Sequence, residues 1–220
     1  MRVLDLFSGL GGWSAAFKDR GHEVITVDMD KKFNPIIIAD IMDMTYKDLE
    51  KFGKFDVILA SPPCNCFSVL TIPKYWKKEL GVSYPKNEKT IKAIELVKHT
   101  LDMIEILNPR FWILENPMGM LRKQYFMKKY RMMTITQCQY GREDRKPTDL
   151  WGKFPKDFKP KKCGTKGSCH IKVHRGEIKG VQSNKKWSLG GVKDKANSAY
   201  RSKLPYGLSL AVCVACEKEL

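Results

Sequence analysis

The chain has 220 residues, and its 40 Lys and Arg outnumber its 24 Asp and Glu to give a formal net charge of +16. No stretch approaches the about 18 consecutive apolar residues of a membrane span, and the first residues enter a strand pattern directly, so we expect neither a membrane segment nor a signal peptide. The seven cysteines are irregularly spaced, which favours reduced thiols in the cytoplasm, or in a host's cytoplasm if the protein is viral, over a disulfide framework.

The excess positive charge lies in the second half of the chain. Residues 1–120 hold 16 basic and 16 acidic residues, whereas residues 121–150 hold 8 against 3 and residues 151–195 hold 13 against 3. A basic block of this kind is typical of nucleic-acid binding. The alternative is a solvated, lysine-rich surface.

Strand and helix patterns alternate along the chain. Short apolar runs predict strands at residues 2–7, 22–28, 34–40, 55–61, 110–116 and 132–138. Amphipathic patterns predict helices at residues 13–21, 90–109 and 204–220. Apolar strands that alternate with helices indicate an α/β fold, with a doubly wound, mostly parallel sheet covered by helices on both faces. Lys-rich and Gly-rich residues 151–195 would form a small basic insert in it.

Polar residues stand where the predicted strands end. These are Asp5, Asp28, Asp40, Ser61 to Cys64, and Glu115 with Asn116. The carboxyl ends of parallel strands lie at one edge of a sheet, and ligands of such sheets bind beyond that edge. We therefore expect these residues to line one site.

The first of these strand ends is rich in glycine. The stretch D-L-F-S-G-L-G-G-W, Asp5 to Trp13, has three glycines in a strand-to-helix turn, which permits close approach of a ligand to the backbone, although a plain tight turn would look the same. Asp28 is placed to accept hydrogen bonds from the two hydroxyls of a ribose, although it could instead be a helix cap. Asp40 could accept a hydrogen bond from the exocyclic amine of adenine. Together they suggest a nucleoside across the strand ends.

Several motifs together resemble the DNA cytosine-5 methyltransferase family. The glycine-rich turn, Asp28, the A-D-I triplet ending at Ile41, S-P-P-C-N-C-F-S from Ser61 and L-E-N-P from Leu114 occur in the order and spacing of that family. The resemblance implies a Rossmann-like methyltransferase fold that binds S-adenosylmethionine. It implies a catalytic domain of residues 1–150 and 196–220 and a target-recognition segment of residues 151–195. The implied cofactor-binding residues are Asp5, Phe7, Gly9, Leu10, Gly11, Asp28, Met29, Asp40, Ile41, Pro62 and Ser202.

The resemblance also implies the catalytic groups. Cys64 would be the thiolate that adds to C6 of cytosine and makes C5 nucleophilic, with Pro62 and Pro63 fixing its approach; the alternative is a small buried cysteine. Glu115 would hold cytosine N3 and the amino group as a carboxyl of raised pKa, the alternative being a salt-bridged strand end.

A basic residue is expected to assist Glu115. The segment Q-Y-G-R-E-D-R-K-P-T-D-L-W from Gln139 resembles the family segment that carries an arginine near the cytosine carbonyl, and either Arg145 or Lys146 could take that place. Cys66 falls at a position where the family varies, and we interpret it as a packing residue.

Two segments are candidates for contact with nucleic acid. Residues 69–90 correspond to a mobile loop of the family that closes on DNA, and the contacts we expect in it are Lys74, Tyr75, Trp76 and Lys77; an ordinary surface loop is the alternative. The short basic segment 151–195 would recognise a brief or loosely defined sequence.

The basic segment also holds potential metal ligands. Cys163, Cys169, His170 and His174 lie close together in sequence, and a zinc ion could hold a segment too small to build its own core. The spacing matches no common zinc finger, so free thiols and surface histidines are favoured over a metal site.

The sequence thus predicts a DNA (cytosine-5)-methyltransferase that uses S-adenosylmethionine and acts on double-stranded DNA. One alternative keeps the chemistry but acts on tRNA. Another is a catalytically inactive DNA-binding regulator or partner subunit, suggested by Pro117 in place of the usual valine and by Lys146 in place of the usual arginine.

Overall fold

A computed structural model describes residues 1–164, 168–170 and 202–220 of the chain. Its centre is a seven-stranded sheet with the order β3-β2-β1-β4-β7-β9-β8. The strands are β1 (Arg2–Leu6), β2 (Glu23–Asp28), β3 (Ile37–Ile38), β4 (Val57–Ala60), β7 (Phe111–Pro117), β8 (Met132–Thr136) and β9 (Pro147–Lys153). All six strands predicted from the sequence are present, β3 as only two residues.

The sheet is mostly parallel, as the sequence predicts. The strand β1 pairs in parallel with both β2 and β4, β2 with β3, and β4 with β7. The strand β9 runs antiparallel between β7 and β8. Because β1 is central and the chain winds outward in both directions from it, the expected doubly wound architecture is confirmed.

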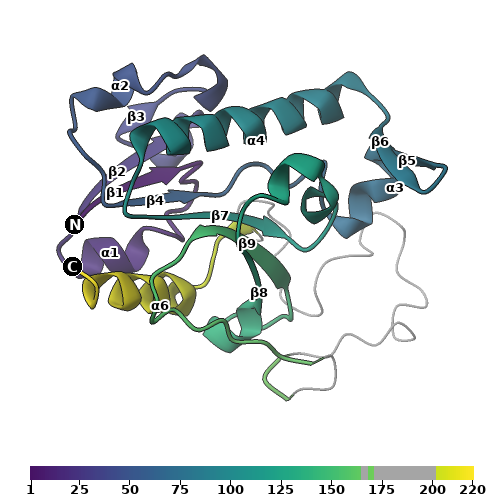
Figure 1. Ribbon diagram of the computed structural model, residues 1–220. Helices are drawn as coiled ribbons and strands as arrows, with labels where there is room; N and C mark the ends of the chain where they lie inside the picture. The colour runs from purple at the N-terminus through teal and green to yellow at the C-terminus, as the bar shows by residue number, and fades with distance from the viewer. Residues whose placement is uncertain (165–167, 171–201) are drawn as a thin grey trace.

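Helices cover both faces of the sheet (Figure 1). The long helix α4 (Glu88–Leu107) lies on one face, and α1 (Ala15–Asp19) and α6 (Tyr206–Glu217) lie on the other. Alternate residues of a strand pack in two separate hydrophobic cores, one between the sheet and α4 (the α4 core) and one between the sheet and the helices α1 and α6 (the α1–α6 core). Leu4 belongs to the α4 core and Val3 to the α1–α6 core. Asp5 therefore points to the same face as Val3, because side chains two apart on a strand share a face.

The ends of α4 follow from its sequence. The side chain of Asn87 accepts a hydrogen bond from Thr90 N at 3.1 Å and caps the first turn. At the other end Asn108 adopts a left-handed conformation (φ 42°), and Pro109 follows it, so the helix cannot continue.

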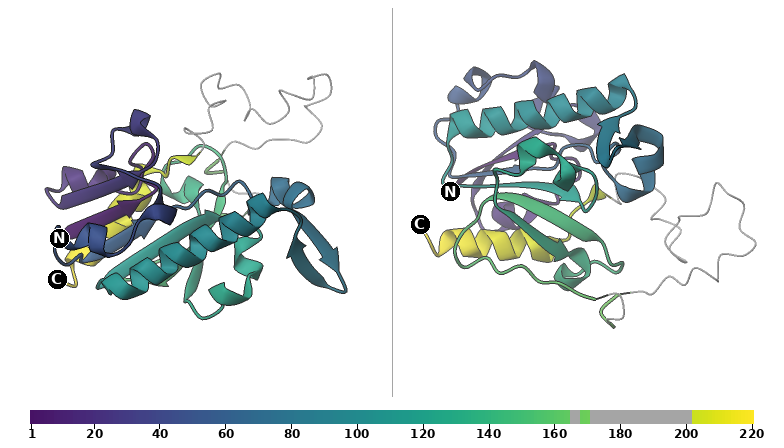
Figure 2. Two further views of the ribbon diagram at one scale, coloured as in Figure 1. Left: turned by 90° about the horizontal axis from the view of Figure 1, so that it is seen from above. Right: turned by 45° about the vertical axis from the view of Figure 1, so that its right-hand side comes forward.

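The segment after β4 forms a small separate hairpin. Residues Ile72–Tyr75 form α3, and β5 (Trp76–Glu79) pairs antiparallel with β6 (Val82–Pro85). Figure 2 shows this hairpin projecting beyond the end of α4. The remaining short elements are α2 (Lys47–Glu50), η1 (Lys31–Phe33), η2 (Ile41–Asp43), η3 (Val69–Thr71), η4 (Leu121–Lys123), η5 (Tyr125–Met127) and η6 (Gln137–Tyr140).

The sheet and its two cores continue past residue 150. The strand β9 contains that residue, and Trp151 within it is buried against the α4 core. Phe154 and Phe158 pack in the α1–α6 core, so the chain leaves the domain only after them. Within the described part of the chain, no helix has the length and apolar character needed to cross a membrane.

Candidate active site at the strand ends

The glycine-rich turn after β1 is left-handed at three positions. Phe7, Gly9 and Gly11 have φ of 62°, 48° and 68°, a region that suits glycine and strains Phe7. The turn is held to β2, because Gly9 N donates to Asp28 Oδ2 at 2.8 Å and Ser8 N donates to the Val27 carbonyl at 3.0 Å. Leu10 at its tip is 45% exposed.

The two aspartates of the next strand ends already accept backbone hydrogen bonds. Asp28 Oδ1 accepts from Asp30 N at 2.9 Å, and Asp40 Oδ1 accepts from Met42 N at 3.0 Å, which caps η2. Each carboxylate oxygen can accept a second hydrogen bond, so these contacts orient the carboxylates without consuming them. Between them along the chain, Met29 is exposed; Ile41, which follows Asp40, is buried.

Asp5 is buried without a hydrogen-bond partner for either carboxylate oxygen among the described residues, and the same holds for the hydroxyl of Ser14. Burial raises the pKa of Asp5 to about 7, an effect that nearby Ser14 and Lys18 oppose. Buried polar atoms normally have partners. Unmatched acceptors beside the glycine-rich turn therefore fit a site that receives hydrogen-bond donors from a ligand.

The start of α6 returns to this turn. A side-chain carbon on Gly12 would lie 2.6 Å from Leu204 N, so the backbone of Leu204 packs directly on the turn. Ser202 is two residues before Leu204, which brings the expected cofactor residue of the C-terminal segment to the same region as the glycines. The hydroxyl of Ser209 also joins α6 to α1 by accepting from Ala16 N at 3.1 Å.

The loop that carries Cys64 is anchored at both ends. Before Cys64, the carbonyl of Pro62 accepts from Asn116 Nδ2 at 3.0 Å, and Ser61 Oγ accepts from Trp13 Nε1 at 2.9 Å. The carbonyl of Cys64 itself accepts from the amides of two later residues at 3.0 Å, which closes a tight turn. The half-buried thiol of Cys64 therefore lies on a loop whose backbone is fixed by hydrogen bonds.

After Cys64 the loop is fixed to the segment that follows β7. Met120 N donates to the Phe67 carbonyl at 2.7 Å, and Ser68 forms an isolated bridge with Gly119. A side-chain carbon on Gly119 would lie only 2.1 Å from Phe67 O, so glycine is required at this crossing. Cys66 is 2% exposed and burial raises the pKa of its thiol, which agrees with a packing role.

Glu115 on β7 is the second buried carboxyl of the site. It is 4% exposed, and its Oε1 has no hydrogen-bond partner among the described residues. Burial raises the pKa of Glu115, while Lys146, the Ser61 hydroxyl and Arg142 oppose the shift. A carboxyl group in this environment keeps its proton to higher pH than an exposed glutamate does, and it can donate that proton to a ligand.

The structure separates the two candidate basic residues. Arg145 Nε donates to the carbonyl of Cys163 at 2.9 Å. Lys146 is the strongest of the charges that stabilise ionised Glu115, so it suits the basic role better. Arg142 also acts on Glu115, and it lines a cavity of about 280 Å³ bounded by residues 141–144 and 203–206.

The hairpin residues expected to contact nucleic acid fall into two groups. Lys74 and Lys77 are exposed. Tyr75 and Trp76 are instead buried, at 6% and 3% exposure, and Trp76 Nε1 donates to the carbonyl of Cys66 at 2.6 Å. The rings of Tyr75 and Trp76 therefore pack in the α4 core rather than face solvent, and Trp76 is bonded to the loop that carries Cys64.

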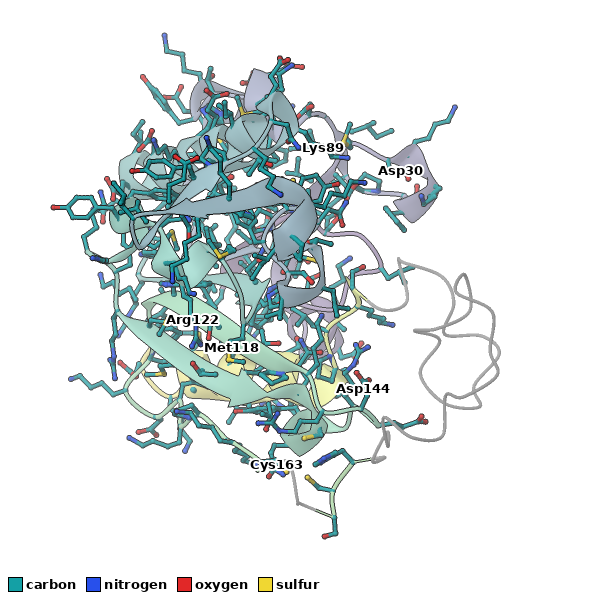
Figure 3. The ribbon with its side chains drawn as sticks, turned by 90° about the vertical axis from the view of Figure 1, so that its right-hand side faces the viewer. Asp30, Lys89, Met118, Arg122, Asp144 and Cys163 are labelled. Carbon is teal, nitrogen blue, oxygen red and sulfur yellow. The ribbon has the colours of Figure 1, made fainter. Side chains whose placement is uncertain are left out.

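Sequence analysis missed several residues that complete the site. Arg142 lies inside the basic segment that drew attention to Arg145, and Ser14 directly follows the glycine-rich turn, so both had a signal in the sequence. Trp13 and Asn116 had been noted only as parts of motifs, and their roles as hydrogen-bond donors to the Cys64 loop depend on tertiary contacts. Figure 3 shows Met118 and Arg122, which follow β7 on the same side of the molecule as Asp144.

Comparison with solved structures agrees with the fold. A putative DNA modification methyltransferase from an Escherichia coli prophage superposes with a TM-score of 0.50 at 20% identity, over 73% of this chain and 51% of that one. A methyltransferase of Entamoeba histolytica superposes with a TM-score of 0.52 at 14% identity, over 74% of this chain and 57% of that one. Both likenesses concern the Rossmann-like methyltransferase fold.

Comparison of sequences gives the family. A probable DNA (cytosine-5)-methyltransferase of Frog virus 3 is 34% identical over 77% of this chain and 78% of its own length. The type II methyltransferase M.AplI of Arthrospira platensis is 32% identical, but the match covers 57% of this chain and only 34% of the bacterial protein. The family profile for C-5 cytosine-specific DNA methylase matches residues 1–140, the part of the chain that contributes every strand from β1 to β8. This chain therefore belongs to the C-5 cytosine-specific DNA methylase family.

Proposed function

We propose that this protein transfers a methyl group from S-adenosylmethionine to C5 of cytosine in double-stranded DNA, through a transient bond between Cys64 and C6 of the base. The observation that carries the proposal is Glu115. Its buried carboxyl has a raised pKa and one oxygen without a partner among the described residues, and it lies near the end of β7, next to the Asn116 side chain that holds the Cys64 loop.

The chemistry requires both groups at once. Cytosine C5 is a weak nucleophile until the Cys64 thiolate adds to C6, which moves electron density into the ring. The proton on Glu115 compensates that density at N3, and Lys146 offsets the charge left on Glu115. After C5 has accepted the methyl group, C5 loses its proton to a base, the C6–S bond breaks, and the thiolate leaves.

The strand ends fit the methyl donor. The sulfonium of S-adenosylmethionine supplies an electrophilic methyl group. Asp28 would accept hydrogen bonds from its ribose hydroxyls, and Asp40 would accept one from its adenine amine. The turn from Phe7 to Gly11 allows the ligand to approach the backbone closely. The unpartnered oxygens of Asp5 support this assignment, because a buried acceptor gains most from a donor that arrives with a ligand. Met29, Ile41, Pro62 and Ser202 would complete the cofactor site.

The substrate must reach Cys64 outside the stacked duplex. A cytosine within B-DNA has both faces covered, so the enzyme would extrude it at a cost of a few kcal/mol. Lys74 and Lys77 on the hairpin would offset part of this cost by contacts to phosphates. Residues 151–195, which are described only in part, would supply target recognition through their excess of positive charge.

The test is methyl transfer from tritiated cofactor to duplex DNA. We expect the wild type to label DNA and Cys64→Ser to lose transfer altogether, while Cys66→Ala, which removes a thiol two residues away, keeps it. Duplex DNA that contains 5-fluorocytosine should trap a covalent complex with the wild type but not with Cys64→Ser, because fluorine at C5 cannot leave as a proton.

Other outcomes would contradict the proposal in distinct ways. Label on tRNA but not on competing duplex DNA would assign the chemistry to the tRNA substrate. Binding of DNA without label or trapped adduct would indicate an inactive regulator. Equal labelling by wild type and Cys64→Ser would refute the covalent mechanism.

A further inference from the structure

Away from the strand ends, three thiols and one imidazole gather at the outer side of η6. One cysteine comes from η6 and the others from the segment after β9; the group, which we name the thiol–imidazole cluster, consists of Cys138, Cys163, Cys169 and His170. All four ligand atoms lie within 4.8 Å of one another. In Figure 3 Cys163 lies at the lower edge of the molecule, beyond Asp144 and Met118.

The spacing within the cluster is that of a tetrahedral metal site. Zinc–sulfur bonds of about 2.3 Å and zinc–nitrogen bonds of about 2.0 Å at tetrahedral angles put two sulfurs about 3.8 Å apart, and a sulfur and a nitrogen about 3.6 Å apart. The sulfurs of Cys138 and Cys169 are 3.7 Å apart, and His170 Nδ1 lies 3.6 Å from Cys169 Sγ and 3.5 Å from Cys163 Sγ. The sulfurs of Cys163 and Cys169 are closer, at 3.0 Å, and would move apart by less than about 1 Å around an ion.

The backbone holds the first part of this segment in place independently of the cluster. Cys163 N donates to Thr136 Oγ1 at 2.7 Å, Thr136 N donates to the Lys161 carbonyl at 3.1 Å, and Lys161 N donates to the Tyr140 hydroxyl at 2.9 Å. Cys163 is therefore fixed beside the end of β8. Gln139 Nε2 also donates to Cys169 Sγ at 2.9 Å, an outer contact of the kind that orients thiolate ligands in metal sites.

We propose that the thiol–imidazole cluster binds one Zn²⁺ ion as a structural site. Three cysteines and one histidine are a common ligand set for structural zinc, and four protein ligands leave no open position for catalysis. Residues 151–195 have 13 basic residues against 3 acidic ones, a composition that disfavours a hydrophobic core of their own. The ion would tie the start of this basic segment to the catalytic domain, beside Arg145, whose guanidinium bonds the Cys163 carbonyl.

The sequence alone favoured free thiols, because it offered no recognisable finger spacing. The structure adds Cys138, which lies 25 positions before Cys163 in a different element. His174, one of the four candidates from the sequence, lies outside the described residues, and Cys138 joins Cys163, Cys169 and His170 in its place. The site does not depend on the proposed methyl transfer, so each can fail without the other.

The test is the metal content of the full chain. Protein purified without chelator should hold one zinc ion per chain, and metal-free protein should take up Co²⁺ with the visible absorption of tetrahedral thiolate coordination. Cys169→Ala and His170→Ala alter a surface segment outside the core, so both variants should fold. They should weaken zinc binding by more than the about 100-fold that loss of an outer contact costs.

Two further cysteine variants serve as controls. Cys216→Ala, in the buried face of α6, and Cys64→Ser, in the candidate active site, should each keep one zinc ion per chain. Absence of zinc together with no uptake of Co²⁺ would overturn the proposal, and so would full zinc content in Cys169→Ala. A Cys163–Cys169 disulfide in the freshly purified protein, detected as a mass two hydrogens lower, would equally overturn it.

Discussion

Replacement of Asp5 by asparagine should change how the stability of the protein depends on pH. Asp5 is 1% exposed, and burial raises its pKa from 3.8 to about 7. The folded state therefore binds this proton more tightly than the unfolded state does. The wild type therefore loses folding stability as pH rises, because the buried carboxyl must ionise. This loss is absent below about pH 4, grows between about pH 4 and pH 7, and is constant above that. Asparagine has the same shape and does not titrate.

The size of the effect follows from the two pKa values. The interval from 3.8 to about 7, at about 1.4 kcal/mol for each tenfold change in proton binding, amounts to about 4 kcal/mol above pH 7. At about pH 4.5 the same relation gives a destabilisation of the wild type by Asp5 of only about 1 kcal/mol. The free energy of unfolding of Asp5→Asn, minus that of the wild type, should therefore rise by about 3 kcal/mol between about pH 4.5 and about pH 8.

Urea unfolding of both proteins at a series of pH values measures this difference. Any constant offset from the new amide cancels, because only the change with pH is compared. Asp102→Asn, on the exposed side of α4, is the control for the loss of one negative charge. A difference between Asp5→Asn and the wild type that stays constant from about pH 4.5 to about pH 8 would refute the view that burial raises the pKa of Asp5.

Three other predictions concern Glu115, the close crossing at Gly119, and the exposed lysines expected to contact DNA. Glu115→Gln should lower the rate of methyl transfer by about 100-fold or more, and wild-type transfer should fall as pH rises above the raised pKa of Glu115. A pH–rate profile of both proteins tests both expectations. An unchanged rate in the variant would exclude Glu115 as the acid. Gly119→Ala should cost about 2 kcal/mol in urea unfolding and slow transfer, since its methyl group would meet Phe67 O; wild-type stability and rate would contradict the close crossing. Joint replacement of Lys74 and Lys77 by alanine should reduce the salt dependence of DNA binding by about two ions, measured as the slope of log affinity against log salt, and an unchanged slope would remove the hairpin from the interface.

Much of the fold was predictable because its strands are short, apolar and separated by clear helix signals. The strand β9 was missed. It begins at Pro147, contains the charged Asp149, and has Gly152 in its interior, all of which weaken a strand pattern. Tertiary contacts account for two of these: Asp149 is paired with Arg122, whose Nε lies 2.7 Å from its Oδ2, and Gly152 lies where a side chain would meet the Trp112 carbonyl.

The residues of the site were predictable as members of a motif but not as contacts. Position in the motif pointed to Cys64 and Glu115, and strand ends placed both on one edge of the sheet. Between Arg145 and Lys146 the sequence could not choose, because the answer depends on a carbonyl 18 positions later in the chain. Tyr75 and Trp76 stand beside lysines and resembled a surface pair, yet the hairpin turns them inward.

The crossing of Gly119 over Phe67 has a consequence for how this protein can change over time. Cys64 lies in the loop after β4 and Glu115 on β7, and the loop after β4 is bonded to the segment after β7, so a shift of either one moves the other. Variation in the exposed lysines or in the basic segment leaves that shared frame untouched. Sequence change can then accumulate at the periphery while the spacing between Cys64 and Glu115 is inherited unaltered.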